Sequence, residues 1–321
     1  MMNDEGRMPS ERGSILLYVV WVMTLLSLLA AGIGSQALFA LDFSERLSDQ
    51  LRASYVARGA IQQIAAVLRN DHTPSVDAFN DRWASLSYQD EPLAGGTFSV
   101  TALDDEERRI NLNTASAEVL ARLLETTGGL SERDAAEAAA AIEDWRDEDD
   151  TERRGGAEGS YYRSLRDAYD AHDGPFEQIE ELRLVRGISP EVYDRVEPHV
   201  TVFGSGRINL NTAPARVLRA LGLSEAGSSG VVAFRAGEDN QERTADDRVL
   251  SSVIGLASDL TAYVPAEDIA PLTSQELQQM LAVHSTAFRV SLEARVATPE
   301  SRMSVVCVLD RQGRVTLWAE R

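Results

Sequence analysis

The stretch SILLYVVWVMTLLSLLAAGIGSQALFAL, Ser14–Leu41, decides the architecture of this chain. It carries no charge and is mostly apolar. Because roughly 20 apolar residues cross a bilayer as a helix, the stretch is long enough to span a membrane with some tilt. A cleaved secretory signal has an apolar core of only about 7–15 residues. We therefore expect an anchor that stays on the protein, with the rest of the chain attached to it.

The residues before the apolar stretch indicate how it enters the membrane. Gly13 stands directly before it and follows a short polar leader that contains Arg7 and Arg12. This layout is typical of a type IV prepilin-like signal, which a peptidase cuts after the glycine on the cytoplasmic side. An ordinary signal anchor fits the length as well. In either case the two arginines favour a cytoplasmic N-terminus under the positive-inside rule.

Tyr18 departs from the usual pilin pattern. If Ser14 is the first mature residue, Tyr18 is the fifth, where most pilins carry a glutamate. A carboxylate in lipid is tolerated only when a partner neutralises it, such as the amino terminus of a neighbouring subunit. Tyr18 therefore indicates either that the chain is no pilin or that it has no subunit ahead of it in a filament.

Composition limits the function classes. The chain has 321 residues and a net charge of −20, and all 31 of its basic residues are arginine. The absence of lysine excludes a lysine Schiff base and a P-loop lysine. Cys307 is the only cysteine, so the chain forms no internal disulfide, and we expect a small buried hydrophobe there. We find no catalytic constellation and expect no enzyme.

Beyond the anchor, the pattern predicts one long helix followed by a small sheet. Apolar residues keep a helical period as far as Leu68, and Asn70–Pro74 then ends the helix. Alternating residues predict strands at 97–103, 288–296, 304–309 and 315–318, the last two joined by a turn at 310–313. Because a small sheet needs three or more strands and a covering helix, we expect the early strand to pair with the late ones. The helical middle, about Ile110–His284, is then a large insertion in a small α+β domain.

That middle contains an exact repeat. RINLNTA occurs at Arg109–Ala115 and again at Arg207–Ala213, and each copy leads into a short helix. We expect Thr114 and Thr212 to cap these helices, with Pro214 in the first turn of the second. The first copy continues through a glycine turn to a second helix over 131–145, which is a helix-hairpin-helix pattern; residues 176–196 hold a second candidate unit.

Helix-hairpin-helix units often bind DNA, so a membrane-anchored DNA receptor of the competence type is an alternative. DNA binding depends on cations that displace counterions from phosphate. Here the hairpin is followed by the acidic run DWRDEDDTE, residues 144–152, which would repel a polyanion. Charge therefore disfavours this alternative, and we expect no nucleic-acid partner.

The same acidic run is the best site candidate. Asp147 and Asp149 alternate, and a glycine turn precedes Glu158. Carboxylates at such positions supply the hard oxygen ligands that calcium takes, although the spacing is not that of an EF-hand. A solvated acidic loop would have the same spacing. The four histidines show no paired spacing, so a zinc site has no support.

Taken together, these pieces resemble the minor pseudopilin K family of type II secretion systems (general secretion pathway protein K). The resemblance rests on RGSILL at the start of the apolar stretch, Tyr18, both RINLNTA copies, DWRDED…GGAEGSYY, and GPFEQIEELRLVRGISPEVYDRVEPHVTVFG. It covers nearly the whole chain. It implies cleavage between Gly13 and Ser14 by prepilin peptidase, methylation of Ser14, and a pilin-like long helix packed on a small antiparallel sheet with a large all-α insertion.

The family also implies a place and partners: the tip of a short periplasmic pseudopilus, in complex with minor pseudopilins I and J. Calcium is a further family property, with Asp147, Asp149 and Glu158 as ligands and Asp144 as a weaker candidate. Gly159 stands where the family often has an aspartate, which leaves the ligand number open. Contact with secreted proteins is also left open.

These expectations divide the chain into five parts and place it in the bacterial inner membrane as a single-pass protein with a periplasmic C-terminal domain. The parts are a cleaved leader (1–13), the transmembrane half of the N-terminal helix (14–41), the first part of the pilin-like domain (42–109), the inserted α-helical domain (110–285) and the C-terminal strands (286–321).

Overall fold

One long helix carries the rest of the molecule. The computed structural model describes residues 11–296 and 298–320. Helix α1, Glu11–Arg69, has 59 residues and is about 88 Å long at 1.5 Å per residue. It ends where the sequence predicts, since Asn70 follows as a turn residue. The first ten leader residues lie outside the described part, whereas Gly13 and Ser14 belong to the first turn of α1.

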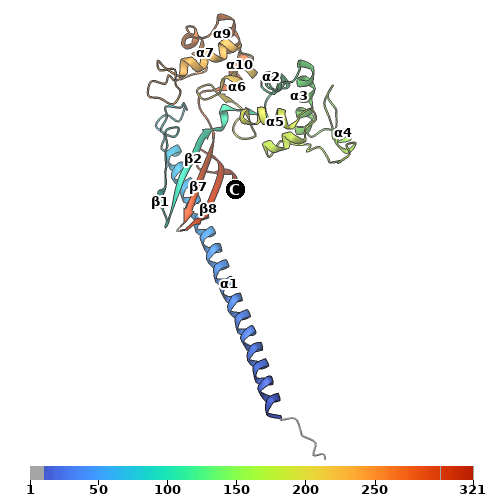
Figure 1. Ribbon diagram of the computed structural model, residues 1–321. Coiled ribbons are helices and arrows are strands. Elements are labelled where there is room, and N and C mark those ends of the chain that lie inside the picture. Colours follow the sequence, from blue (N-terminus) through green and yellow to red (C-terminus); the bar gives the residue numbers. More distant parts are fainter. Residues whose placement is uncertain (1–10, 297, 321) are drawn as a thin grey trace, which may run out of the picture.

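The two halves of α1 have different surroundings (Figure 1). The described side chains of residues 15–36 and 38–47 are exposed, and the apolar window among them has a mean hydropathy of 2.3. By length and composition α1 can cross a membrane. Farther along, one face is buried under the sheet through Ala53, Val56, Ala57, Ala60, Ile61, Ile64, Ala65 and Leu68.

Five antiparallel strands lie against the buried half of α1. They are β1 (Glu91–Leu93), β2 (Gly96–Asp105), β7 (Ala287–Val296), β8 (Thr298–Asp310) and β9 (Val315–Glu320), in the order β1-β2-β7-β8-β9. The early strand β2 pairs with the late strand β7, with Phe98 opposite Ala294, as expected. The turn between β8 and β9 contains Gly313 at a φ of 84°, a conformation that glycine adopts without strain.

The core between α1 and the sheet is aromatic and aliphatic. Trp83 packs edge-on against Phe288 on β7, with ring centroids 5.3 Å apart. Cys307 on β8 is fully buried in the same core, and burial raises the pKa of its thiol to about 12. The prediction of a small buried hydrophobe at Cys307 is confirmed.

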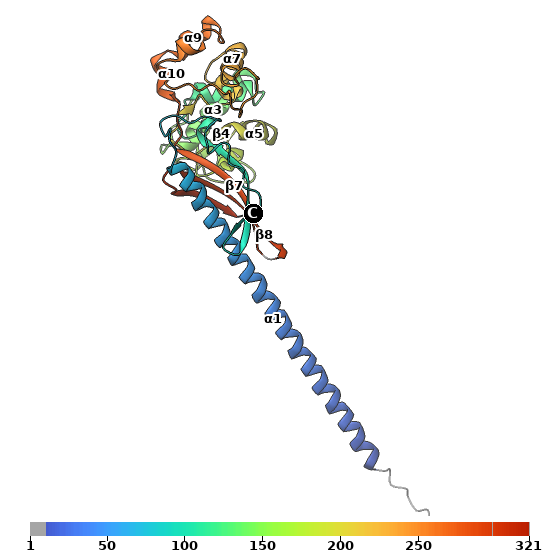
Figure 2. The ribbon, with the colours of Figure 1, turned by 90° about the vertical axis from the view of Figure 1, so that its left-hand side faces the viewer.

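A helical head connects β2 to β7 and has its own hydrophobic core. Its helices are α2 (Ala117–Thr126), α3 (Glu132–Arg146), α4 (Gly159–Arg163), α5 (Pro190–Val196), α6 (Ala215–Ala220), α7 (Glu225–Arg235), α8 (Leu256–Leu260), α9 (Ala266–Leu272) and α10 (Gln275–Met280), with 3-10 turns η1 (Glu106–Arg108), η2 (Ile179–Leu184) and η3 (Glu197–His199). In Figures 1 and 2 the head lies beyond the end of the sheet, opposite the free end of α1.

Each RINLNTA copy begins a unit of the head in the same way. The first copy contains β3 (Ile110–Asn111), which runs parallel to β4 (Val200–Thr201). The second contains β5 (Ile208–Asn209), parallel to β6 (Leu281–Ala282). Arg146 at the end of α3 donates hydrogen bonds to the Leu112 and Ala115 carbonyls, and Arg235 at the end of α7 does the same for Leu210 and Ala213.

The capping prediction for these units is wrong. The residue that caps α2 is Ser116, and Pro214 occupies the N-cap position of α6. The asparagine side chains explain the shift: Asn111 accepts from the Asn113 amide and Asn209 from the Asn211 amide, so the chain stays in a turn for longer. The first helix of the candidate unit at 176–196 is also only the 3-10 turn η2.

Buried carboxylates join the head to the sheet. Asp105, at the end of β2, accepts hydrogen bonds from Asn209 at 3.0 Å and from Thr212 at 2.5 Å. Asp77 accepts from the Ser285 amide and from Arg311. Burial raises the pKa of Asp77 and of Asp105 to about 6. The second repeat is therefore held directly against the end of the sheet, and Thr212 serves this contact instead of a helix cap.

Candidate metal centre

The loop that follows α3 brings together the three carboxylates predicted as the main ligands. One oxygen from each of Asp147, Asp149 and Glu158 lies within 4.8 Å of the others. These residues span 12 positions of sequence, so the loop must return on itself. The arrangement has the size and chemistry of a site for a hard cation.

Local structure explains how the loop returns. Helix α3 ends at Arg146, whose guanidinium fixes it to the first RINLNTA segment, and Asp147 is the C-cap. Gly155 has a φ of 85°, and a Cβ on Gly156 would collide with the carboxylate of Asp144. The two glycines therefore allow the chain to pass close to the end of α3 and deliver Glu158 to the cluster.

Glu158 carries the clearest sign of a missing partner. It is 3% exposed, and it is the N-cap residue of α4 although its side chain makes no capping bond. Both of its carboxylate oxygens are buried without a hydrogen-bond partner among the described residues. Burial, together with Asp144 and Asp147, raises the pKa of Glu158 to about 7. Asp147 Oδ1 is also buried and unpartnered. Buried carboxylate oxygens are costly to leave unsatisfied, so this donor set fits a bound cation.

Asp144 lies beside the three carboxylates but is engaged differently. It is fully buried, and its oxygens accept from the Arg153 amide at 3.2 and 3.3 Å and from the Arg153 guanidinium at 2.9 Å. The guanidinium also contacts Asp147. Reasoning from the sequence missed Arg153, whose only signal is that it is the first basic residue after the acidic run.

Aromatic side chains pack α4 against the end of α3. Trp145 on α3 packs edge-on against Tyr162 of α4 at a centroid distance of 5.1 Å, and Tyr169 packs against both rings. These contacts hold α4, which directly follows Glu158, against the end of α3. The position of Glu158 is therefore fixed because α4, which follows it, is packed against the end of α3, where the loop begins.

A second group of three carboxylates, Asp71, Asp77 and Asp81, already has a cation. Arg311 donates to Asp71 at 2.7 Å and to Asp77 at 2.5 and 2.6 Å. Asp81 accepts from the Ala78 amide at 2.8 Å and from Thr73 at 3.4 Å. Since these groups have protein partners, this cluster does not call for a metal.

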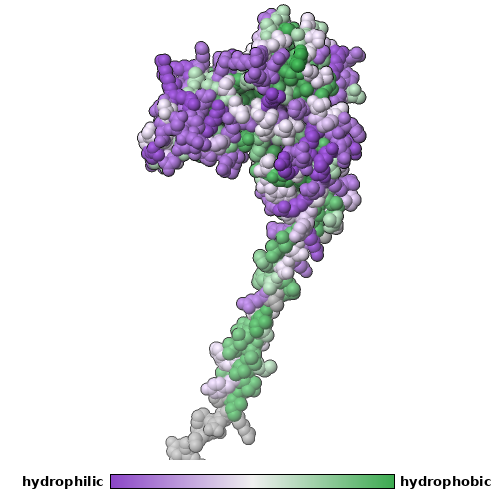
Figure 3. Space-filling model, turned by 180° about the vertical axis from the view of Figure 1, so that it is seen from behind, coloured by the Kyte–Doolittle hydropathy of each residue, from purple (hydrophilic) through white to green (hydrophobic). Residues whose placement is uncertain are grey.

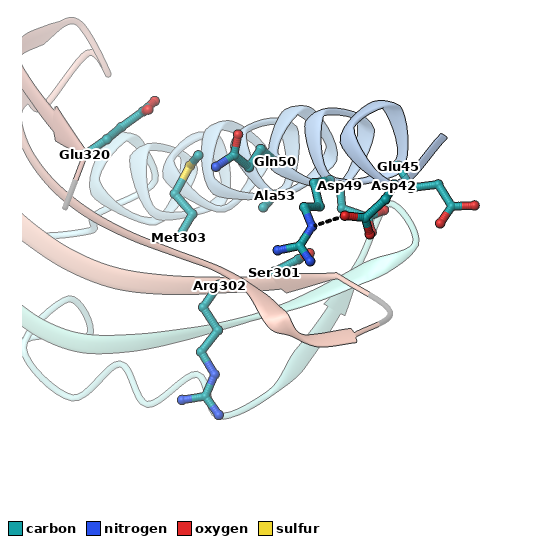
Figure 4. Close-up of a pocket in the computed structure, with 10 residues that line it drawn as sticks. Asp42, Glu45, Asp49, Gln50, Ala53, Ser301, Arg302, Met303 and Glu320 are labelled. Carbon is teal, nitrogen blue, oxygen red and sulfur yellow. Dashed lines mark hydrogen bonds and ion pairs between the residues drawn. The ribbon is translucent and has the colours of Figure 1, made fainter. Parts of the chain in front are cut away.

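A hollow between α1 and the sheet is a third candidate (Figure 4). It lies where α1 leaves β8, between Asp42–Ala53 on one side and Ser301–Met303 on the other. Arg46 pairs with Asp42 across one helical turn at 3.0 Å. Within the described ranges, its carboxylates do not form a group that could hold a metal. The loop after α3 therefore remains the best metal site.

Comparisons with known proteins agree with this architecture. Residues 96–205, which include the whole carboxylate cluster, match the family described as type II secretion system (T2SS), protein K. The type II secretion system protein K of Klebsiella pneumoniae is 24% identical over 319 residues, covering 95% of this chain and 94% of that protein. The protein of the same name from Pectobacterium carotovorum subsp. carotovorum is 28% identical, covering 89% of each. The chain is therefore similar to protein K of type II secretion systems over most of its length.

A solved structure shares the fold of this chain. It is the crystal structure of the GspK-GspI-GspJ complex from the type 2 secretion system of enterotoxigenic Escherichia coli. The match has a TM-score of 0.65 and 22% identity, and it covers 89% of this chain and 99% of that chain. Over the part that it covers, this chain therefore has the same fold as a chain of that complex.

Proposed function

We propose that this chain is a member of the protein K family and a minor pseudopilin at the tip of a periplasmic pseudopilus, where it helps to initiate assembly. The observation that carries the proposal is α1, whose apolar half is exposed and whose other half forms the core of a pilin-like domain. This construction suits a subunit that is stored in a membrane and packs by its helix in a filament. The family match over residues 96–205 supports the same role.

The residues at the start of α1 are the proposed site at which the chain is processed. Prepilin peptidase cuts between Gly13 and Ser14, and the new amino terminus at Ser14 is methylated. The helix then holds the protein in the inner membrane, with its N-terminus towards the cytoplasm and the sheet and head in the periplasm. Exposed apolar residues along α1 support an anchor of this kind.

The partners are the minor pseudopilins I and J, by analogy with the solved GspK-GspI-GspJ complex. Beyond the anchor, Leu47, Leu51 and Tyr55 recur at every fourth position of α1 and remain exposed. Residues four apart lie on one face of a helix, so these side chains form a stripe that continues the lipid-facing surface. The helices of the partner subunits cover this stripe.

The position and breadth of the head favour a place at the tip of the pseudopilus. It occupies the end of the molecule opposite the free end of α1 and is broader than the sheet below it (Figures 1 and 3). A further subunit stacked above would meet the head before its helix could pack against α1. Growth therefore proceeds from below. The helix pairs within the head serve as helix-hairpin-helix-like supports, and their acidic surroundings disfavour the DNA-receptor alternative.

The tip position is tested at Tyr18. A glutamate at Tyr18 would place a carboxylate in lipid, and a tip subunit has no neighbour ahead whose amino terminus could neutralise it. We expect Tyr18→Glu to reduce secretion while the protein stays at the tip, and Tyr18→Phe to secrete normally. Secretion assays with immunogold labelling of pseudopili measure both. Full secretion by Tyr18→Glu, with label along the filament shaft, would contradict the tip position.

Calcium has a structural role in this proposal. Asp147, Asp149 and Glu158 would hold the ion, and backbone oxygens or water would complete the six to eight ligands that calcium takes. The unpartnered oxygens of Glu158 support the assignment. Asp147, at the end of α3, and Glu158, directly before α4, would be linked through the bound ion, which would hold these two helices together and take part in no reaction.

A further inference from the structure

Arg153 belongs to the same loop as the three carboxylates and already supplies a positive charge to them. Its guanidinium contacts Asp147, lies 2.9 Å from Asp144 and lies 3.3 Å from Glu143. Its side chain is 42% exposed, so one side of the guanidinium faces solvent. The loop thus carries a cation of its own beside the proposed ion site.

The contacts of Arg153 with Asp144 and Asp147 differ in kind. Asp144 is fully buried, and both the amide and the guanidinium of Arg153 serve it. Such a buried carboxylate depends on its partner, because an unpaired buried charge is strongly unfavourable. Asp147 is half-buried and uses only Oδ2 for Arg153, whereas its Oδ1 is buried without a partner. The ion pair between Arg153 and Asp144 is therefore the one that persists when an ion binds. The ion can replace the contact between Arg153 and Asp147.

The cluster around Arg311 shows what complete neutralisation by a guanidinium looks like. There, Arg311 binds Asp71 and Asp77, and the oxygens of these two groups have partners. In the loop after α3, Arg153 reaches Asp144 and Asp147 but leaves Glu158 unpartnered. Arg153 therefore neutralises one side of the site and leaves the other side to a ligand.

We propose that Arg153 is a tethered competitor of the bound cation: it holds Asp147 in the ion-free protein, and it weakens ion binding by placing a positive charge beside the site. The proposal rests on the calcium site proposed above. Two consequences follow. The ion-free loop stays folded, because Arg153 offsets the repulsion among its carboxylates. The affinity is kept low, as in extracellular calcium modules, whose dissociation constants are about 10⁻⁴–10⁻³ M.

Calorimetric titration of the full-length protein in detergent with calcium chloride tests this competition. We expect Arg153→Gln to bind calcium about tenfold more tightly than the wild type, because it removes a unit positive charge that contacts the ligand Asp147 in a partly solvent-exposed setting. Arg153→Lys keeps the charge and should bind nearly as the wild type does. Arg133→Gln is the matched control, because it removes an exposed arginine of α3 whose pairing with Glu137 lies outside the site.

Thermal melting gives a second readout that also reports folding. Without calcium, Arg153→Gln should melt below the wild type, since Asp144 loses the guanidinium and keeps only the Arg153 amide. With calcium, its melting temperature should rise by more than that of the wild type. A purely structural role for Arg153 would predict weaker calcium binding and a smaller rise. Equal or weaker binding by Arg153→Gln would overturn the proposal.

The wild type and Glu158→Gln separate failure of this inference from failure of the calcium site. If the wild type binds and Glu158→Gln does not, the site stands and the Arg153 variants decide the competition. If the wild type does not bind but Arg153→Gln does, the calcium assignment fails and Arg153 is a permanent occupant that excludes the ion. If neither binds, both proposals are wrong.

Discussion

Replacing Gly13 with valine is expected to leave the leader on the chain and to reduce type II secretion to background. The proposed cut lies directly after Gly13, where the absence of a side chain lets the peptidase approach the backbone. An uncut chain keeps the charged leader at the position where the mature N-terminus would enter the helix bundle of the filament. Mass spectrometry of the purified protein measures the cut, and assay of the culture supernatant measures secretion.

Gly32→Ala is the control for the Gly13 variant. Gly32 lies in the apolar stretch that follows Gly13, and a Cβ added there would meet no atom of the described residues within 4 Å. This variant should be cut and should secrete as the wild type does. A wild-type protein whose N-terminal mass includes residues 1–13, with secretion intact, would contradict the processing step.

Removing calcium is expected to destabilise the head, and removing a ligand should abolish that effect. A ligand at 100 times its dissociation constant stabilises a protein by about 2.7 kcal/mol. For a domain of about 150–250 residues, each kcal/mol shifts the melting temperature by about 2–4 °C, so we expect a rise of about 5–10 °C with calcium. Differential scanning fluorimetry with calcium or a chelator measures it. Asp149→Ala and Glu158→Ala should each lose the calcium-dependent rise.

The acidic loop after α7 offers a matched control for the ligand variants. Asp246 lies in that loop and accepts hydrogen bonds from the amides of Glu238 and Asp239, outside both groups of carboxylates that could hold a metal. Asp246→Asn should therefore keep the full calcium-dependent rise in melting temperature, even if the substitution changes the melting temperature measured without calcium. A wild-type melt that calcium does not change would contradict the site.

Periodicity and pairing rules predicted much of the fold. The helix end near Asn70 and the burial of Cys307 follow from patterns within local stretches of sequence. The pairing of β2 with β7 follows from the rule that a small sheet needs three or more strands. The capping prediction at Thr114 and Thr212 was wrong. Asn111 and Asn209 prolong the turn, and Asp105 takes the Thr212 hydroxyl from 107 positions away. Contacts at such separations cannot be read from local patterns.

The candidate metal site also has features that the sequence predicted and features that it did not. Spacing and resemblance predicted Asp147, Asp149 and Glu158, which the structure brings together. They did not predict that Arg153 binds Asp144 or that Gly156 leaves room for that carboxylate. Those features depend on how the loop returns to the end of α3. The sequence shows that acidic residues are near one another, but it does not show which oxygens remain without partners.

The most direct test of a pseudopilin role is assembly with its partners. The full-length chain, tagged and co-expressed in a bacterial membrane with minor pseudopilins I and J of the same organism, is extracted in detergent and analysed by size exclusion with mass spectrometry. The account predicts a stable ternary complex that Leu51→Arg, in the exposed stripe of α1, weakens. Elution of the wild-type chain alone, with neither partner retained, would contradict it.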